Sequence, residues 1–294
     1  MNESAELPLA DRVHRGPPVL HYVEGPAAGP AFLLLHGVTR CWRDWATLLP
    51  ELAQEWQVVA LDHCGHGESG RTPGEYRVID YARHLASFVR ETEFHEPLVV
   101  FGHSLGAMVA LHLAAECPKK IAGVVLEDPP FHTMGENIAA TPYRAQFAGM
   151  QEVARRGGEV EAMTDALANI RLPGPNGEVR LGDTRDRASL RFSAQCLVQI
   201  DPEVFTPLVA GTWLEGFDHL ALWPRVKCPL LLLQGDPHSG GALTDEDANL
   251  SERLAARCQR IRFDGVGHQI HRTVPEQVVA ALRKWAQEAE LLHR

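Results

Sequence analysis

A serine with one glycine two residues before it and another two residues after it carries the strongest chemical signal in this chain. The pentapeptide Gly102-His103-Ser104-Leu105-Gly106 follows an apolar run at residues 98–101 and leads into a second apolar run at 107–113. A strand, a tight turn and a helix in this order lift a serine hydroxyl above the edge of a sheet, and the glycines let strand and helix approach each other. The pattern predicts that Ser104 is the nucleophile of an acyl transfer.

A histidine near the end of the sequence has the placement of a general base. The run 260–263 is followed by Asp264-Gly265-Val266-Gly267-His268, so this imidazole lies on a loop directly after the last expected strand. From such a loop it can reach a serine on a neighbouring loop and accept its proton. His271 is the nearest rival, and we interpret it as a helix-entry or surface residue. The flanking glycines free the loop and favour His268.

Two backbone N–H groups are expected to hold the developing oxyanion. Leu105 follows the nucleophile and opens a helix, whose first N–H groups have no partner within the helix. Val38 follows the strand-ending pair His36-Gly37 and is the expected second donor. We also expect His36, Gly37 and His103 to line the substrate site.

Two aspartates are candidates for the carboxylate that would orient the histidine and stabilise its cationic form. Asp128 comes after the apolar run 121–126, and Asp236 comes after the run 230–233. Both lie on loops that follow expected strands, so placement alone leaves both open. Glu127 neighbours the first candidate, but the alternating pleat of a strand should aim it elsewhere.

The elements that must position these groups follow a regular order. Short apolar runs alternate with longer amphipathic ones, which predicts an α/β fold with a mostly parallel, doubly wound sheet. Strands are expected at 19–23, 31–35, 57–61, 98–101, 121–126, 230–233 and 260–263. Helices are expected at 42–53, 78–93, 105–116, 245–257 and 276–290.

The pattern changes between about residues 129 and 224. Strand-like runs disappear there, and weakly helical segments alternate with breakers such as 172–177. We interpret 129–224 as an inserted helical cap, and 1–128 together with 225–294 as one catalytic core. Aromatic residues of a helical insertion often pack against the insertion itself. We nevertheless expect four of them to reach the substrate: Phe131, Phe147, Trp213 and Phe217.

Composition restricts the partners. The chain has 294 residues, with 38 acidic and 28 basic residues and a formal charge of −10, which disfavours nucleic acid and anionic membranes. Its six cysteines are scattered, so we expect neither a metal site nor a disulfide framework. The N-terminal residues lack the basic and apolar segments of a secretory signal. We therefore expect a cytoplasmic protein that acts on a small molecule, and the sequence carries no signal for an oligomeric state.

Four motifs together resemble the α/β-hydrolase superfamily. They are H-G at 36–37, D-x-x-G-x-G-x-S at 62–69, G-H-S-L-G at 102–106 and G-x-G-H at 265–268. The resemblance spans nearly the whole chain and implies an α/β-hydrolase core, a Ser-His-Asp triad and no cofactor. The chain departs from the family at Cys64, where many members carry arginine or proline.

The resemblance also helps to choose between the two candidate carboxylates of the triad. Many members place it three residues after the glycine of the loop that follows the run 230–233, and that position is His238 here. The sequence around this loop, G-D-P followed by G-A-L-T at 241–244, is similar to members whose acid follows the preceding strand. We therefore favour Asp128 and keep Asp236 as the alternative.

These features predict hydrolysis of a carboxylic ester, or a related acyl bond, of a small to medium apolar substrate through an acyl-enzyme. A carbon-carbon bond hydrolase and a cofactor-free perhydrolase would use the same three side chains. The former usually adds a basic or polar clamp, which the sequence does not reveal. A non-catalytic ligand receptor on the same fold is a further alternative. A haloalkane dehalogenase is disfavoured, because its elbow would carry an aspartate in place of Ser104.

Overall fold

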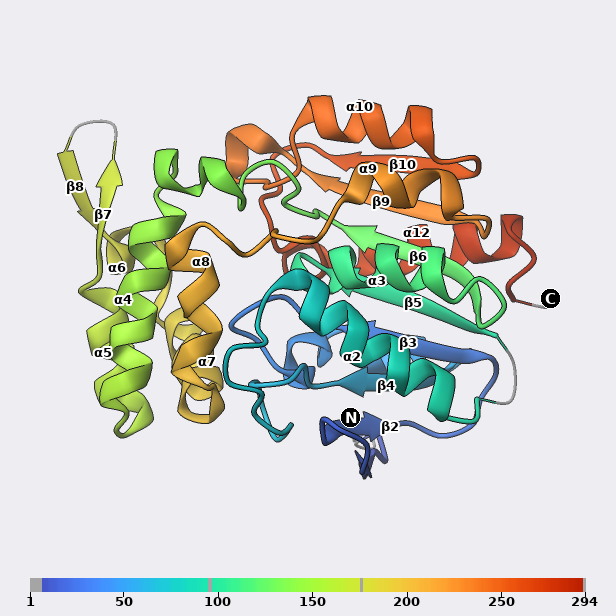
Figure 1. Cartoon of the computed structure of the whole chain (residues 1–294), viewed down its shortest axis with the longest axis horizontal. Coiled ribbons are helices and arrows are strands. Elements are labelled where there is room, and N and C mark those ends of the chain that lie inside the picture. Colours follow the sequence, from blue (N-terminus) through green and yellow to red (C-terminus); the bar gives the residue numbers. More distant parts are fainter. Residues whose placement is uncertain (1–6, 95–96, 175–176, 293–294) are drawn as a thin grey trace, which may run out of the picture.

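An eight-stranded sheet with the order β1-β2-β4-β3-β5-β6-β9-β10 forms the centre of the molecule (Figure 1). The computed structural model describes residues 7–94, 97–174 and 177–292. β2 pairs antiparallel with both β1 and β4, and all other neighbouring strands are parallel. The strands are β1 (Ala10–His14), β2 (Leu20–Glu24), β3 (Ala31–Leu35), β4 (Gln57–Leu61), β5 (Leu98–His103), β6 (Ile121–Glu127), β9 (Leu230–Gly235) and β10 (Cys258–Phe263). The predicted mostly parallel α/β fold is confirmed.

Helices cover both faces of this sheet, because successive strand residues point to opposite faces and both faces are apolar. In β3, Leu33 and Leu35 join the core beneath α2 (Val78–Glu91), α3 (Leu105–Glu116) and α10 (Asp245–Leu254). Phe32 and Leu34 join the core beneath α1 (Leu49–Leu52) and α12 (Pro275–Glu288). The short α11 (Ile270–Thr273) precedes α12. Because alternate residues of each strand are buried on opposite faces of the sheet, the strands appear in the sequence as continuous apolar runs.

A group of helices from the expected cap lies beyond the carboxyl ends of the parallel strands (Figure 1). It contains α4 (Tyr143–Arg156), α5 (Val160–Ala168), α6 (Leu181–Thr184), α7 (Arg187–Gln199) and α8 (Thr206–Ala210). By contrast, α9 (His219–Leu222) and the 3-10 turn η4 (Trp223–Arg225) pack against α3 of the core. The remaining 3-10 turns are η1 (Trp42–Trp45), η2 (Glu136–Ala140), η3 (Pro202–Phe205) and η5 (Pro237–Ser239).

Three local predictions were wrong. A two-stranded hairpin, β7 (Arg171–Gly174) and β8 (Gly177–Arg180), occupies part of the segment expected to lack strands, and residues 175–176 of the predicted breaker lie outside the described residues. The helix expected at 42–53 is divided into η1 and α1, since Pro50 at the start of α1 has no N–H to continue a helix through it. β1 was missed because its sequence, ADRVH, is largely polar and its three central residues are exposed.

Within the described ranges, no helix has the length and apolar character needed to cross a membrane.

Candidate active site

Ser104 occupies a strained turn between β5 and α3. Its backbone has φ 54° and ψ −111°, a region that side-chain-bearing residues rarely adopt. A Cβ on Gly106 would lie 1.9 Å from the Leu35 carbonyl oxygen, and one on Gly102 would lie 2.0 Å from the Gly106 carbonyl oxygen. Neither position therefore tolerates a side chain, and the two glycines allow the close strand-helix contact that holds the serine in this conformation.

Asp128 and His268 form a short pair beside this turn. The imidazole Nδ1 lies 2.6 Å from Asp128 Oδ2, and the carboxylate is completely buried. Burial alone would raise the pKa of Asp128, but the His268 bond and backbone N–H bonds hold this pKa below its ordinary value. An ionised carboxylate can only accept, so Nδ1 of His268 must carry the proton. In the neutral ring, that tautomer leaves Nε2 as the nitrogen that can accept a proton.

The loop after β9 holds the Asp128 carboxylate in place. The N–H groups of Gly235 and Leu243 donate to Oδ1 at 3.0 and 3.2 Å, and the N–H of Ala242 donates to Oδ2 at 2.6 Å. Asp128 itself has φ 47°, so its backbone is strained as well. Three converging donors and the imidazole fix the orientation of this carboxylate.

Asp236, the alternative acid, has a different set of partners. It accepts hydrogen bonds from the N–H groups of His238 and Gly265, both at 3.0 Å, and its carboxylate lies 3.3 Å from Arg262. These contacts join the β9 loop to the loop that carries His268. Of the two candidate acids, the structure brings only Asp128 into contact with the imidazole.

The two expected oxyanion donors lie next to the elbow. Leu105 is the first residue of α3, and within the described residues neither its N–H nor that of Val38 has a hydrogen-bond partner. Gly37 packs directly on the turn, since a Cβ there would lie 3.3 Å from Ser104 Cβ. Thr39 has φ 72° and its N–H lies 3.3 Å from His66 Nε2. The loop that carries Val38 is thus anchored at both ends.

His36 does not line the substrate site, contrary to prediction. Its ring is completely buried, where Nδ1 donates to the Gly37 carbonyl and Nε2 accepts from the His63 N–H. Burial lowers the pKa of His36 well below its usual range, and lowers those of His63 and His66 to about 3 and about 4. These neutral rings form a buried polar support for the oxyanion loop.

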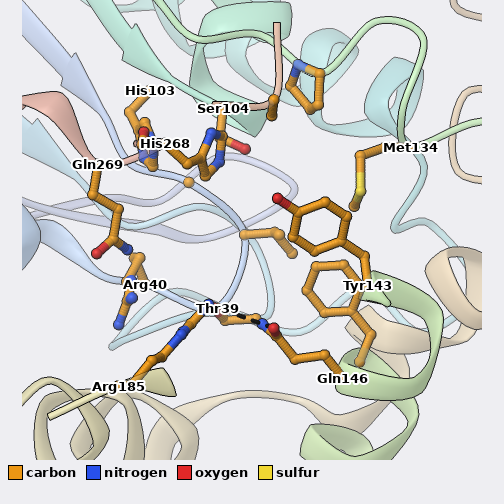
Figure 2. A pocket seen from close by; sticks show the side chains of 15 residues that line it. Thr39, Arg40, His103, Ser104, Met134, Tyr143, Gln146, Arg185, His268 and Gln269 are labelled. Carbon is orange, nitrogen blue, oxygen red and sulfur yellow. Dashed lines mark hydrogen bonds between the residues drawn. The ribbon is translucent and has the colours of Figure 1, made fainter. Parts of the chain in front are cut away.

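A pocket opens over Ser104 (Figure 2). Predicted residues that line it are Gly37, Val38, His103, Ser104, Phe147 and His268. Residues that the prediction missed are Thr39, Arg40, Pro130, Met134, Tyr143, Gln146, Arg185, Ala242 and Gln269. The proximity of Arg40 to the H-G motif was a usable signal, whereas Arg185 lies in a segment with little periodicity and gave none.

Three of the four predicted aromatic residues pack elsewhere. Phe131 stacks on His219 with ring centroids 4.4 Å apart and contacts Trp223 edge-on. Trp213 is fully buried, and Phe217 is buried in the same apolar cluster. Large aromatic side chains gain most by complete removal from water, so they fill the interior instead of lining the pocket.

A second buried histidine lies behind the elbow. His271 Nδ1 is 2.9 Å from Glu127 Oε1, and its Nε2 is 3.5 Å from Asp44 Oδ2. Burial alone would lower the pKa of His271, but the two carboxylates raise it to about 9. At neutral pH this ring is therefore a cation and cannot act as a base. Its ring lies 5.1 Å from that of His103, whose Nε2 donates to the His268 carbonyl at 2.9 Å.

Known proteins resemble this chain in sequence and in fold. The α/β-hydrolase fold family matches residues 30–171. A haloalkane dehalogenase from Mesorhizobium japonicum is 25% identical over 313 residues, covering 99% of this chain and 93% of that protein. Lipase LipV from Mycobacterium tuberculosis is 28% identical over 266 residues, covering 88% and 94%. The crystal structure of E-2-(acetamidomethylene)succinate hydrolase has a TM-score of 0.72 at 20% identity, covering 95% of this chain and 100% of that chain.

The strand order, the elbow and these matches agree. The chain has the α/β-hydrolase fold, and this fold and the matched proteins support a hydrolase.

Proposed function

We propose that this chain is a serine hydrolase that cleaves an ester, or a related acyl bond, through an acyl-enzyme. The observation that carries the proposal is the Asp128–His268 pair at 2.6 Å, which leaves the second imidazole nitrogen unprotonated in the same pocket as the strained Ser104. A hydroxyl with a neighbouring base, and a base oriented by a carboxylate, is the arrangement that activates a serine nucleophile.

The reaction would proceed in two halves. His268 Nε2 removes the proton of Ser104 as the oxygen attacks the substrate carbonyl, and the N–H groups of Val38 and Leu105 stabilise the oxyanion. Collapse of this intermediate expels the alcohol, which takes the proton from the imidazolium and leaves an acyl group on the serine. Water then attacks the acyl carbon with the same base, releasing the acid and restoring the hydroxyl.

The serine at the elbow also distinguishes the proposed ester hydrolysis from dehalogenation, the activity named for the relative from Mesorhizobium japonicum. Displacement of a halide by a serine oxygen would leave an alkyl ether, which has no carbonyl for water to attack. A carboxylate nucleophile leaves an ester, which water can cleave. Ser104 at the centre of the elbow therefore supports acyl transfer and argues against dehalogenation.

A labelling experiment tests the nucleophile. A fluorophosphonate probe should label the wild-type protein and Ser251→Ala, but not Ser104→Ala. Ser251 is the matched control, because it is buried on α10 and its hydroxyl donates to the Asp247 carbonyl at 2.8 Å. Labelling that persists in Ser104→Ala would show that another residue is the nucleophile.

A substrate panel tests the reaction. We expect turnover of p-nitrophenyl acetate, butyrate or octanoate, with the rate in Ser104→Ala falling by about 10³-fold or more. A folded wild-type protein that hydrolyses none of these esters would contradict the esterase proposal.

A further inference from the structure

The charges around the pocket are opposite in sign to those of the chain. Among the residues described as lining it, two are arginines, Arg40 and Arg185, and none is an aspartate or glutamate. The chain as a whole has a formal charge of −10. Asp128, the nearest buried carboxylate in the catalytic arrangement, already pairs with His268 and three N–H groups. The pocket lining therefore carries positive charge and no carboxylate of its own.

Arg185 is partly buried and poorly partnered. Its one side-chain hydrogen bond runs from Nη2 to Gln146 Oε1 at 3.4 Å. In the described part of the chain, no carboxylate oxygen lies within 4.0 Å of its guanidinium. Burial lowers the pKa of Arg185 to about 10, and the like charge of Arg40 adds to this effect. A guanidinium offers five N–H donors, so most of those on Arg185 are available to a ligand.

Its sequence neighbours behave differently. Arg180 at the end of β8 and Arg187 and Arg191 on α7 extend into solvent, and each pairs with a carboxylate, at 3.2, 2.8 and 2.7 Å respectively. Asp183 of α6 and two acids of α5, Asp165 and Glu161, thus serve the exposed arginines, whereas no carboxylate of the described residues pairs with Arg185. The lack of a partner for Arg185 is specific to the pocket.

Arg40 lies just beyond the oxyanion loop and is nearly fully buried. Its Nη1 donates to Ser193 Oγ at 2.9 Å, while its Nε is 3.9 Å from Asp44 Oδ1. That carboxylate already accepts a 2.8 Å bond from Arg272. Figure 2 shows the two pocket arginines together at one end of the site, with Ser104 at the other.

We propose that Arg185, assisted by Arg40, binds a carboxylate of the substrate, so that the substrate is a short acyl compound with an anionic end. The inference rests on the proposed function and names the substrate class of the same site. A guanidinium matches the planar carboxylate with two parallel hydrogen bonds. A half-ester of a short dicarboxylic acid carries such a carboxylate in the same molecule as its acyl group, and Ser104, Arg40 and Arg185 line the same pocket.

This assignment changes one expectation from the sequence. The sequence predicts a small to medium apolar substrate, because aromatic residues of the insertion are expected to line the site. Phe147, Met134 and Val38 do provide apolar walls, but the end of the pocket formed by Arg40 and Arg185 is cationic. We infer that the acyl chain lies along these apolar walls and that its carboxylate binds at the end formed by the two arginines.

Two matched esters test the proposal. Mono-p-nitrophenyl glutarate carries a terminal carboxylate, and p-nitrophenyl butyrate lacks it. The kcat/KM ratio of the first to the second should fall by about 10- to 100-fold in Arg185→Gln, since a charge-assisted hydrogen bond is lost. The ratio should be unchanged in Arg187→Gln, the exposed control on α7. Arg185→Lys should be intermediate, because it keeps the charge and loses the paired donors.

Protection against labelling gives a second readout that needs no turnover. Glutarate should slow fluorophosphonate labelling of the wild-type protein and of Arg187→Gln, but not of Arg185→Gln. Equal ester ratios in Arg185→Gln and the wild type would overturn the carboxylate proposal while leaving the serine hydrolase intact. Stronger protection by inorganic phosphate than by glutarate would also overturn it. Absence of both turnover and labelling would instead refute the proposed function.

Discussion

Replacing the buried pair His271–Glu127 by two glutamines should remove a large part of the pH dependence of stability between pH 6.5 and 8.5. The ring Nδ1 lies 2.9 Å from Glu127 Oε1, and both side chains are completely buried. The double variant is needed because His271→Gln alone would leave a buried carboxylate without its cation. Burial without that cation would raise the pKa of Glu127 and add a titration of its own.

The direction in which stability changes with pH follows from the raised pKa of His271. The pKa of His271 is raised from 6.5 to about 9, so the folded state binds a proton that the unfolded state has released. This stabilisation is fully present below pH 6.5 and is lost as the pH rises toward 9. Integrating over the window gives a loss of about 2 kcal/mol between pH 6.5 and 8.5. The double variant should not show this loss.

Other titrating histidines do not obscure the result. His21, whose pKa is raised by Asp62, contributes with the same sign but is present in both proteins and cancels in the comparison. Histidines whose pKa is lowered by burial act with the opposite sign, because their unfolded forms are still partly protonated just above pH 6.5, but they too are present in both proteins. They include His36, His63, His66 and His103.

Urea unfolding at half-unit steps from pH 6.5 to 8.5 measures the effect, provided that the m-value stays constant. His219→Gln is the control, since burial lowers the pKa of this partly exposed ring and its removal should change the loss by no more than about 0.4 kcal/mol. If the wild type and the double variant lose stability in parallel, His271 is not a buried cation and the reasoning is refuted.

Three further outcomes follow from the geometry. Asp128→Asn should lower kcat by about 10⁴-fold, while Asp236→Asn should stay within a few-fold and lose about 1 kcal/mol of stability. Ester kinetics would contradict this if Asp236→Asn were the more damaged. Gly106→Ala should abolish activity and destabilise the fold by about 3 kcal/mol or more in urea unfolding, because its Cβ would meet the Leu35 carbonyl; a stable, active variant would argue against the elbow geometry. Trp213→Ala should cost about 3–5 kcal/mol on unfolding and leave KM within twofold, whereas a tenfold rise in KM would return this residue to the substrate site.

The sheet was predictable because its central strands are buried on both faces. β3 and β4 begin and end at the predicted residues, since their apolar runs are continuous and are bounded by turns. The edge strand β1 lacks this signal. It depends on its pairing with β2, and its exposed residues are free to be polar.

The proposed catalytic side chains differ in how much of the sequence is needed to recognise them. Ser104 and His268 stand in short glycine-flanked sequences that can be recognised in isolation. Asp128 and Asp236 follow similar strands, and what distinguishes them is the convergence on Asp128 of N–H groups more than 100 residues away in sequence. The spacing of residues along the sequence does not predict that such distant N–H groups meet at one carboxylate.

The pocket lining was the least predictable part of the site. The sequence prediction selected pocket residues by their apolar character, but apolar residues also prefer the protein interior. Trp213 and Phe217 are accordingly buried in the core. Arg185 gave no signal because a charged residue in a weakly patterned segment is normally solvated, like its neighbours Arg187 and Arg191. Its inward direction depends on how α6 and α7 pack against α4 and α5.

The bond between Asp128 and His268 joins residues that are 140 positions apart, with the whole of the expected cap between them. During synthesis the elbow emerges early, but the proposed base belongs to the loop between β10 and α11. A chain that has not yet docked β9 and β10 carries the serine without an oriented imidazole, and contacts between residues so far apart in sequence form slowly. In refolding, recovery of any esterase activity should therefore lag recovery of the helical signal, because the serine forms its turn before the imidazole is oriented.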